Sequence, residues 1–327
     1  MKYRDLGKTG MKISEVSFGS WAIGGTWGQV EDETSLKALE SAIDEGVNFF
    51  DTADVYGDGR SERLLAQLSK NTKNKIYIAT KAGRRLNPHV EQGYQLSNIR
   101  QFVERSLLNL DVERLDLLQL HCPPSSVYEN AEFFESLKEL IIEGKVAHLG
   151  VSVEKTSEAI KAMEYEHIET IQIIYNLFRM KPEDEVFPLA KKNNVGIIVR
   201  VPLASGMLTG KMTKDTAFAK DDHRLFNRNG ESFDKGETFS GVPYDLALEA
   251  VEELKKIMPT KMTLAQFALK WILMNEAVSC VIPGAKNPSQ AQQNAAASGF
   301  DALSFEVMEK AKAIYEQYLK AEIHPQW

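Results

Sequence analysis

Four side chains suited to proton transfer stand at or just beyond the ends of strand-like apolar runs in the first 121 residues. They are Asp51, Tyr56, Lys81 and His121, and the runs that precede them cover residues 48–50, 76–80 and 115–120. In a β/α barrel such successive strands are neighbours, and chemistry is carried at their carboxyl ends. We therefore expect an acid, a phenol, an amine and an imidazole to meet in one active site.

Each of these residues also has an ordinary structural explanation. Asp51 could cap a helix or a turn, and Tyr56 could be an aromatic residue at the rim. Lys81 could be a solvated strand end, and His121 could be a satisfied core imidazole. The occurrence of all four at three adjacent strand ends favours a catalytic set over four separate coincidences.

Short apolar runs alternate with longer helical patterns along the chain, which is typical of repeated βα units. The predicted strands cover residues 15–19, 48–51, 76–81, 116–121, 147–152, 170–174, 196–200 and 278–283. The first three are followed by predicted helices over residues 32–45, 61–68 and 97–110. Residues 3–14 read as two short strands around a Gly/Lys/Thr/Gly turn, which predicts a hairpin before the barrel. The sequence thus predicts an α/β fold, a (β/α)8 TIM barrel with an N-terminal β-hairpin and long βα loops, as one domain over residues 1–327.

Three stretches do not fit the short βα rhythm: residues 84–95, residues 205–243 (the long loop) and the tail at 321–327. Long loops in a compact domain are often functional, and the first two follow strands on the carboxyl side. We expect these two to frame the substrate pocket. Plain surface insertion is the alternative for each.

The bulk composition is that of an ordinary globular protein, with 43% hydrophobic and 26% charged residues. The formal net charge of −7 argues against electrostatic binding to nucleic acid or to an anionic membrane surface. We therefore predict no nucleic-acid partner and no membrane partner. A ligand that carries phosphate would need a local basic site.

The two cysteines, Cys122 and Cys280, are too few for a disulfide framework and form no paired metal motif. The first residues contain no apolar signal region, and no apolar run reaches the length of a membrane span. These observations predict a cytoplasmic protein. The sequence makes no prediction of the oligomeric state.

Two tracts carry a family resemblance: Phe50-Asp51-Thr52-Ala53 with Tyr56-Gly57, and Leu118-Gln119-Leu120-His121. With the order of the four reactive residues, they resemble the aldo-keto reductases, of the bacterial NADP-dependent type, in a superfamily that includes the potassium-channel β subunits. The resemblance extends over essentially the whole chain. It implies reduction of an aldehyde or ketone, a small-molecule carbonyl substrate, to an alcohol with NADPH.

Hydride transfer to a carbonyl builds negative charge on the oxygen, so the site needs a proton donor at that atom. The resemblance implies that Tyr56 is this donor, although a free phenol has a pKa of about 10. It further implies that the Lys81 ammonium stabilises the phenolate and that Asp51 keeps Lys81 charged and oriented. His121 would hydrogen-bond the substrate carbonyl.

The sequence has no Gly-x-Gly-x-x-Gly after the first strand and no P-loop, so a Rossmann half and a nucleoside-triphosphate site are not predicted. The resemblance implies instead that a nicotinamide cofactor lies across the barrel mouth. Ser152 and Gln172 would reach its carboxamide, residues 203–211 its pyrophosphate, and the Asn294 end its adenine. The full set of implied cofactor-binding residues is Ser20, Trp21, Asp51, Ser152, Gln172, Arg200, Pro202, Leu203, Ser205, Gly206, Leu208, Gly210, Lys211, Gly284, Ala285, Lys286, Gln290, Gln293 and Asn294.

The chain departs from the family pattern at three of these sites. Val153 follows Ser152 where many members have asparagine, and Arg200 replaces the aromatic residue that often stacks on nicotinamide. Gln290 stands where many relatives use arginine for the 2′-phosphate, which leaves Lys286 as the nearby cation. On this basis we expect NADPH, with NADH less favoured. A lone Arg200 cation would favour the reduced cofactor, unless an acidic residue of the long loop pairs with it.

Other interpretations stay open. A regulatory barrel like the channel β subunits would bind the cofactor to sense redox state. A metal-dependent hydrolase could use Asp51, Asp54 and His121, but Lys81 among them would repel the ion, so no metal is predicted. Cys122 is expected to be a buried thiol. An aromatic pocket for an aldehyde could be built from Trp21, Trp27, Tyr56 and Trp327, with surface packing as the alternative for Trp27 and Trp327.

Overall fold

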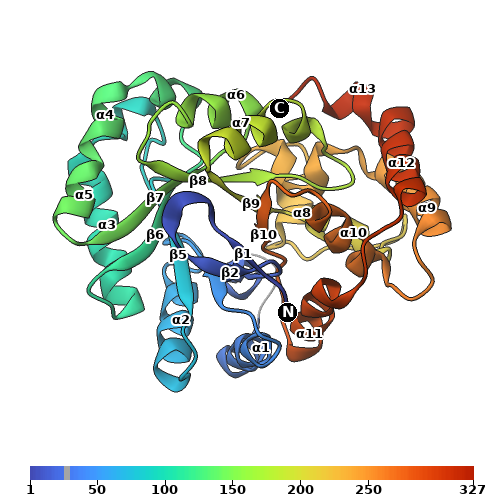
Figure 1. Cartoon of the computed structure of the whole chain (residues 1–327), viewed down its shortest axis with the longest axis horizontal. Helices are drawn as coiled ribbons and strands as arrows, with labels where there is room; N and C mark the ends of the chain where they lie inside the picture. The colour runs from blue at the N-terminus through green and yellow to red at the C-terminus, as the bar shows by residue number, and fades with distance from the viewer. Residues whose placement is uncertain (26–29) are drawn as a thin grey trace.

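The protein folds as a β/α barrel of eight parallel strands, seen in a computed structural model that describes residues 1–25 and 30–327 (Figure 1). The strands are β3 Phe18–Gly19, β4 Phe49–Asp51, β5 Tyr77–Ala82, β6 Leu115–His121, β7 Val146–Ser152, β8 Ile168–Ile174, β9 Gly196–Arg200 and β10 Val278–Val281. They are hydrogen-bonded in sequence order from β3 to β10. Parallel bridges from Val16 to Val281 and from Gly19 to Gly284 join the two ends of this sheet. The predicted barrel is confirmed.

Helices surround the strands and cover their outer faces (Figure 1). They are α1 Asp32–Asp44, α2 Arg60–Asn71, α3 Leu96–Leu110, α4 Ala131–Ser136, α5 Lys138–Ile142, α6 Thr156–Ala162, α7 Val186–Asn193, α8 His223–Phe226, α9 Tyr244–Ile257, α10 Leu264–Leu273, α11 Pro288–Ala295, α12 Phe305–Ile314 and α13 Lys320–Ile323. Within the described ranges, no helix combines the length and the apolar character that crossing a membrane would require.

The alternation of side chains along each strand places polar groups at one end of the barrel interior. Residues two apart on a strand point to the same face. A buried apolar cluster inside the barrel includes Phe49, Ala79, Leu117, Ile198 and Cys280. Two residues further along four of these strands stand Asp51, Lys81, Gln119 and Arg200. The same period that fills the core therefore delivers the polar side chains to the carboxyl end.

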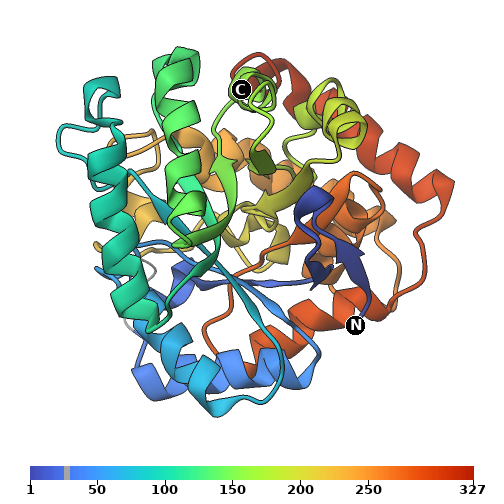
Figure 2. The same ribbon diagram turned by 60° about the vertical axis from the view of Figure 1, so that its left-hand side comes forward.

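The predicted N-terminal hairpin is also confirmed. Strands β1 Tyr3–Asp5 and β2 Lys12–Ser14 pair antiparallel, and Leu6, Met11 and Ile13 join the interior cluster. The turn lies so close to the start of β9 that a Cβ on Gly7 would come within 2.3 Å of the Gly196 nitrogen. The hairpin thus closes the amino end of the barrel, opposite the long loop (Figure 2).

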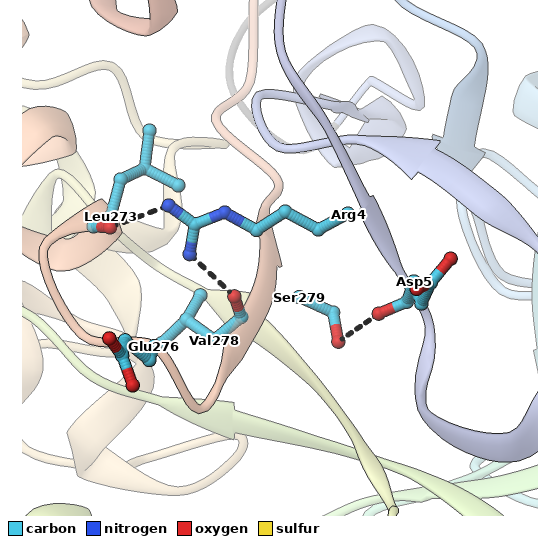
Figure 3. Close-up of a pocket in the computed structure, with 6 residues that line it drawn as sticks. All are labelled: Arg4, Asp5, Leu273, Glu276, Val278 and Ser279. Carbon is cyan, nitrogen blue, oxygen red and sulfur yellow. Dashed lines mark hydrogen bonds between the residues drawn. The ribbon is translucent and has the colours of Figure 1, made fainter.

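Arg4 ties this hairpin to the start of β10 (Figure 3). Its guanidinium donates hydrogen bonds to the carbonyl oxygens of Leu273 and Val278, at 2.6 and 2.8 Å. A cavity of about 330 Å³ beside it is lined by Arg4, Asp5, Leu273, Glu276, Val278 and Ser279. Ser279 Oγ donates to the Asp5 carbonyl at 3.0 Å. These groups hold the closed end of the barrel together.

Candidate active site

The structure brings the four predicted catalytic residues together at the carboxyl ends of β4, β5 and β6. Lys81 Nζ lies 2.5 Å from Asp51 Oδ1 and 3.5 Å from the Tyr56 hydroxyl oxygen. Lys81 also donates to the carbonyl oxygen of Thr52 at 2.9 Å. The Tyr56 and His121 rings meet edge to face, with centroids 5.9 Å apart. This geometry places a hydroxyl and an imidazole side by side, with an ammonium behind the hydroxyl.

Two glutamine amides hold the second oxygen of Asp51. Gln172 Nε2 donates to Asp51 Oδ2 at 2.7 Å, and Gln119 Nε2 donates to the same oxygen at 3.1 Å. Gln172 Nε2 also lies 3.2 Å from Gln119 Oε1. The Gln172 amide, expected at the nicotinamide carboxamide, is therefore engaged with Asp51 here. Gln119 was missed, although its place two residues before His121 on one strand face was a readable signal.

Burial governs the protonation states of this group. It raises the pKa of Tyr56 well above its usual range, as do the Asp51 and Glu237 carboxylates, while the Arg200 and Arg84 guanidiniums oppose the rise. Burial likewise lowers the pKa of Lys81, against the pull of Asp51. Lys81 was expected to lower the pKa of the Tyr56 phenol, but burial and the nearby carboxylates outweigh that effect in the structure. Burial, with Arg84 and Lys81, also holds the pKa of His121 well below its ordinary value, so its imidazole is neutral.

Aromatic rings cover one side of Tyr56. Trp21 stacks on it, with centroids 6.1 Å apart and planes at 18°. His223 and Phe233, from the long loop, pack on Trp21 at 4.8 and 6.1 Å. Of the other aromatic residues considered for the pocket, Trp27 lies outside the described residues. Trp327 packs against Asp234 and Gly241 of the long loop and does not line the cavity described below.

A cavity of about 720 Å³ opens beside this group and extends between the long loop and the start of α11. Its wall includes these predicted site residues: Trp21, Asp51, Tyr56, His121, Ser152, Gln172, Arg200, Pro202, Leu203, Ser205, Gly206, Lys211, Gly284, Lys286, Gln290, Gln293 and Asn294. Five predicted residues do not line it. Ser20, Lys81, Leu208 and Ala285 are buried behind the wall, and Gly210 faces Lys255 and Leu264 instead.

The backbone after β9 is held in an unusual conformation at the cavity wall. Val201, Ala204 and Ser205 have φ angles of 51°, 46° and 54°, and Gly206 has 93°. Positive φ is rare for a β-branched residue such as valine, and such strain clusters at functional sites. Asn176, which the sequence did not indicate, donates to the Val201 carbonyl at 2.9 Å and holds this turn from below.

Ser205 uses its hydroxyl inside the protein. Its Oγ donates to the Glu237 carbonyl at 2.9 Å and accepts from the Phe239 N–H at 3.1 Å. Ser205, expected at the pyrophosphate as part of residues 203–211, therefore uses its side chain to tie the two stems of the long loop together. Only the backbone of this turn is left to face a phosphate.

A buried cluster of ion pairs stands beside Tyr56. The Glu237 carboxylate lies 3.1 Å from Arg84 and 3.4 Å from Arg200, and Arg84 also pairs with Glu154 at 3.0 Å. Burial alone would raise the pKa of Glu237, but the two guanidiniums outweigh it and the net shift is downward. Burial raises the pKa of Glu154 to about 7. Arg200, expected as a lone cation at the nicotinamide, is thus paired with the long loop.

The far end of the cavity is basic. Lys286 and Arg224 both line it, and burial followed by the nearby Arg224 charge lowers the pKa of Lys286. Arg224 is also bound to Asp222, at 2.6 Å. The sequence had indicated Lys286 but missed Arg224, because Arg224 lies in a loop that was assigned to the substrate pocket.

The structure gives little room for the metal-ion alternative at Asp51. The Lys81 ammonium already occupies one oxygen of that carboxylate. Elsewhere in the described ranges, ligand atoms of Cys122, Glu154 and Glu237 lie within 4.8 Å of one another. Each of these two carboxylates is already paired with an arginine side chain. Burial raises the pKa of the Cys122 thiol to about 11, which disfavours the thiolate that a metal ion would require.

Comparisons with known proteins agree with this geometry. The chain is 30% identical to the aldo-keto reductase YhdN of Bacillus subtilis, over 100% of this chain and 97% of that protein. It is 33% identical to a probable voltage-gated potassium channel subunit beta of Arabidopsis thaliana, over 90% of each protein. Its fold matches the solved structure of the glycerol dehydrogenase AKR11B4 from Gluconobacter oxydans with a TM-score of 0.80 and 30% identity, over 100% of this chain and 98% of that one. The model of the aldo/keto reductase family matches residues 15–316, and the chain therefore belongs to this family of oxidoreductases.

Proposed function

We propose that the protein reduces an aldehyde or ketone to the alcohol with NADPH, and that Tyr56 is the proton donor. The observation that carries this proposal is the position of the Lys81 ammonium, 2.5 Å from Asp51 and 3.5 Å from the Tyr56 hydroxyl, at the edge of a large cavity. A proton donor with a fixed cation behind it is what a developing alkoxide requires.

The roles of the residues follow from their contacts. The neutral His121 imidazole donates its N–H to the substrate carbonyl and orients it. As negative charge grows on that oxygen, the Tyr56 hydroxyl releases its proton to it, and Lys81 offsets the charge left on the phenolate. Asp51, held by Gln172 and Gln119, keeps Lys81 in place. Trp21 and the rings packed on it keep water from this side of Tyr56.

The residues of the cavity fit a nicotinamide dinucleotide, which supplies the hydride when bound. The turn at residues 201–206 would present backbone N–H groups to the pyrophosphate. Lys211 lies at the same part of the wall, and Lys286 with Arg224 would meet the 2′-phosphate. In a chain with a net charge of −7, this local concentration of cations supports NADPH over NADH.

A second candidate function is supported by the 33% identity to the probable channel subunit. A barrel of that kind would bind the same cofactor but turn over little substrate. The likeness to a glycerol dehydrogenase supports a third candidate function, in which the enzyme works in the opposite direction and oxidises an alcohol.

A panel of carbonyls and alcohols, assayed with NADPH, NADP⁺ and NADH, tests these proposals. We expect reduction of at least one simple aromatic aldehyde with NADPH. Tight NADPH binding without turnover of any member would favour the regulatory barrel. Turnover of alcohols alone would reverse the assigned direction.

A further inference from the structure

Trp327, the last residue of the sequence, lies in an enclosed site on the long loop. Its indole is buried, and Nε1 donates to both oxygens of Asp234 at 3.0 and 3.2 Å. The Arg179 guanidinium stacks on the ring, with Cζ 4.3 Å from the ring centroid. An exposed tail residue would make none of these contacts.

The backbone of the long loop leaves space for this ring at two glycines. A Cβ on Gly241, which has a φ of 81°, would come within 2.3 Å of Trp327 Cη2. A Cβ on Gly236 would come within 2.3 Å of an Arg179 nitrogen and 3.0 Å of Trp327 Cε2. The loop and the indole therefore fit each other closely.

The contact leads directly to the active site through one short turn, residues 234–237. Asp234 caps this turn, because its Oδ1 also accepts from the Gly236 N–H at 2.7 Å. The next residue, Glu237, lines the cavity and holds Arg84 and Arg200 beside Tyr56. Its carbonyl accepts from Ser205, which belongs to the turn at the other stem of the loop. Trp327 thus braces the outside of a turn whose inside forms part of the cavity wall.

We propose that Trp327 is a positioning residue: by holding Asp234, it keeps Glu237 on its two arginines and the long loop closed over the cofactor groove. This inference rests on the proposed binding of NADPH. Its consequence is that loss of the indole speeds release of the cofactor from the enzyme, although Trp327 touches neither cofactor nor substrate.

The test compares Trp327→Ala and Trp327→Phe with a matched control, Gln326→Ala. Gln326 is the neighbouring exposed residue, and its side-chain amide donates to the Glu322 carbonyl of the same tail. The dissociation rate of NADPH is followed by its own fluorescence in stopped flow, with excess NADP⁺ as the chase. We expect about a tenfold rise for Trp327→Ala, the scale of losing a hydrogen bond to a charged group. Trp327→Phe keeps a ring against Arg179, so its rate of NADPH release should lie between those of the wild type and Trp327→Ala. The rate for Gln326→Ala should equal that of the wild type.

Hydrogen exchange without cofactor supplies the readout that a merely stabilising role would not give. In Trp327→Ala, residues 234–241 should exchange faster while β4, β5 and β6 stay protected. Uniformly faster exchange, or an unchanged rate of NADPH release, would overturn the inference. If Trp327→Ala does not fold, Asp234→Ala removes the acceptor from the loop side and should raise the release rate in the same direction. If the wild type fails to bind NADPH, the proposed function falls, while the exchange comparison still shows whether Trp327 braces the turn.

Discussion

The Arg200 guanidinium lies 3.4 Å from the Glu237 carboxylate, which joins the end of β9 to the long loop. Arg200 also donates to the Val153 carbonyl at 3.0 Å. A lone cation at this place would disfavour the positively charged oxidised nicotinamide ring. The ion pair with Glu237 offsets most of this charge. We therefore expect Arg200 to stabilise the fold rather than to set the preference for NADPH over NADP⁺.

Replacing Arg200 tests this directly. We expect Arg200→Tyr to lower the free energy of unfolding by about 3 kcal/mol, because it strips a partner from a buried carboxylate. The ratio of the Kd values for NADPH and NADP⁺ should stay as in the wild type. Glu237→Gln should change the redox preference instead, because it leaves Arg200 without its carboxylate partner while Arg84 keeps Glu154. It should weaken NADP⁺ binding more than NADPH binding. Calorimetry with both redox forms, beside urea denaturation, decides it. A narrowed NADPH preference in Arg200→Tyr with unchanged stability would restore the lone-cation interpretation.

Tyr56→Phe removes the proposed proton donor and little else. We expect kcat to fall by at least about a hundredfold, the scale of general acid catalysis, with the Kd for NADPH nearly unchanged. Single-turnover kinetics together with a fluorescence titration measure both quantities. Retained turnover would remove Tyr56 from the mechanism.

Lys81→Met should damage both stability and chemistry, since it leaves the buried Asp51 carboxylate without its cation. The expected loss in the free energy of unfolding is about 3–5 kcal/mol, as for other broken buried pairs. The double variant Asp51→Asn/Lys81→Met removes both charges and should recover stability but not kcat. Recovery of activity in the double variant would show that Lys81 serves the fold alone.

The cofactor preference should depend on the two cations at the far end of the cavity. Lys286→Ala and Arg224→Ala should each weaken NADPH by about 1.5–3 kcal/mol, the range for a charge-assisted hydrogen bond, and barely change NADH. Lys211→Ala is the matched control, because both cofactors carry the pyrophosphate that it is expected to meet, and should weaken both alike. Isothermal titration with the two cofactors gives the values. Equal losses for NADPH and NADH in Lys286→Ala would place that residue elsewhere on the cofactor.

Asp54 should make stability depend on pH. Its two carboxylate oxygens are buried without a hydrogen-bond partner in the described structure, and burial, with Glu62, raises its pKa to about 7. The folded protein then keeps a proton that the unfolded chain releases near pH 4, so this contribution to stability is full below about pH 4 and is lost as the pH rises through about 7. The stability of Asp54→Asn relative to the wild type should therefore increase between about pH 4 and pH 7, by up to about 1.4 kcal/mol per pH unit, and stay level above that window. Urea denaturation at several pH values measures the gain. The exposed neighbour Asp58, whose pKa Arg105 and Arg85 lower, is the control, and Asp58→Asn should show no such gain.

The barrel and most of the catalytic group could be predicted because both depend on a short period along strands. Asp51, Lys81 and His121 end apolar runs, and parallel strands bring such ends together whatever the loops do. The same period would have indicated Gln119. The hydrogen bonds from Gln172 and Gln119 to Asp51 could not be predicted, since they depend on which rotamer each amide adopts in the assembled barrel.

The sequence offered a pair between Arg200 and an acidic residue of the long loop as an alternative, and Glu237 proves to be that residue. The ion pairs of Arg84 beside Tyr56 were not predicted. Arg84 and Glu237 are 153 residues apart and come from two loops without periodicity. Ser205 was expected near a phosphate because the family resemblance placed residues 203–211 at the pyrophosphate. In the structure Ser205 has a positive φ of 54°, and its hydroxyl donates to the Glu237 carbonyl at the other stem of the long loop. This contact depends on how the long loop folds, which the sequence does not show.

The most direct test of the account is transfer of deuterium from NADPH deuterated at the reactive C4 position to a simple aromatic aldehyde, followed by mass spectrometry of the alcohol. We predict one deuterium in the product with the wild-type enzyme and at least about a hundredfold slower labelling with Tyr56→Phe. Bound NADPH that never labels any aldehyde or ketone, or labelling at the wild-type rate with Tyr56→Phe, would contradict the account.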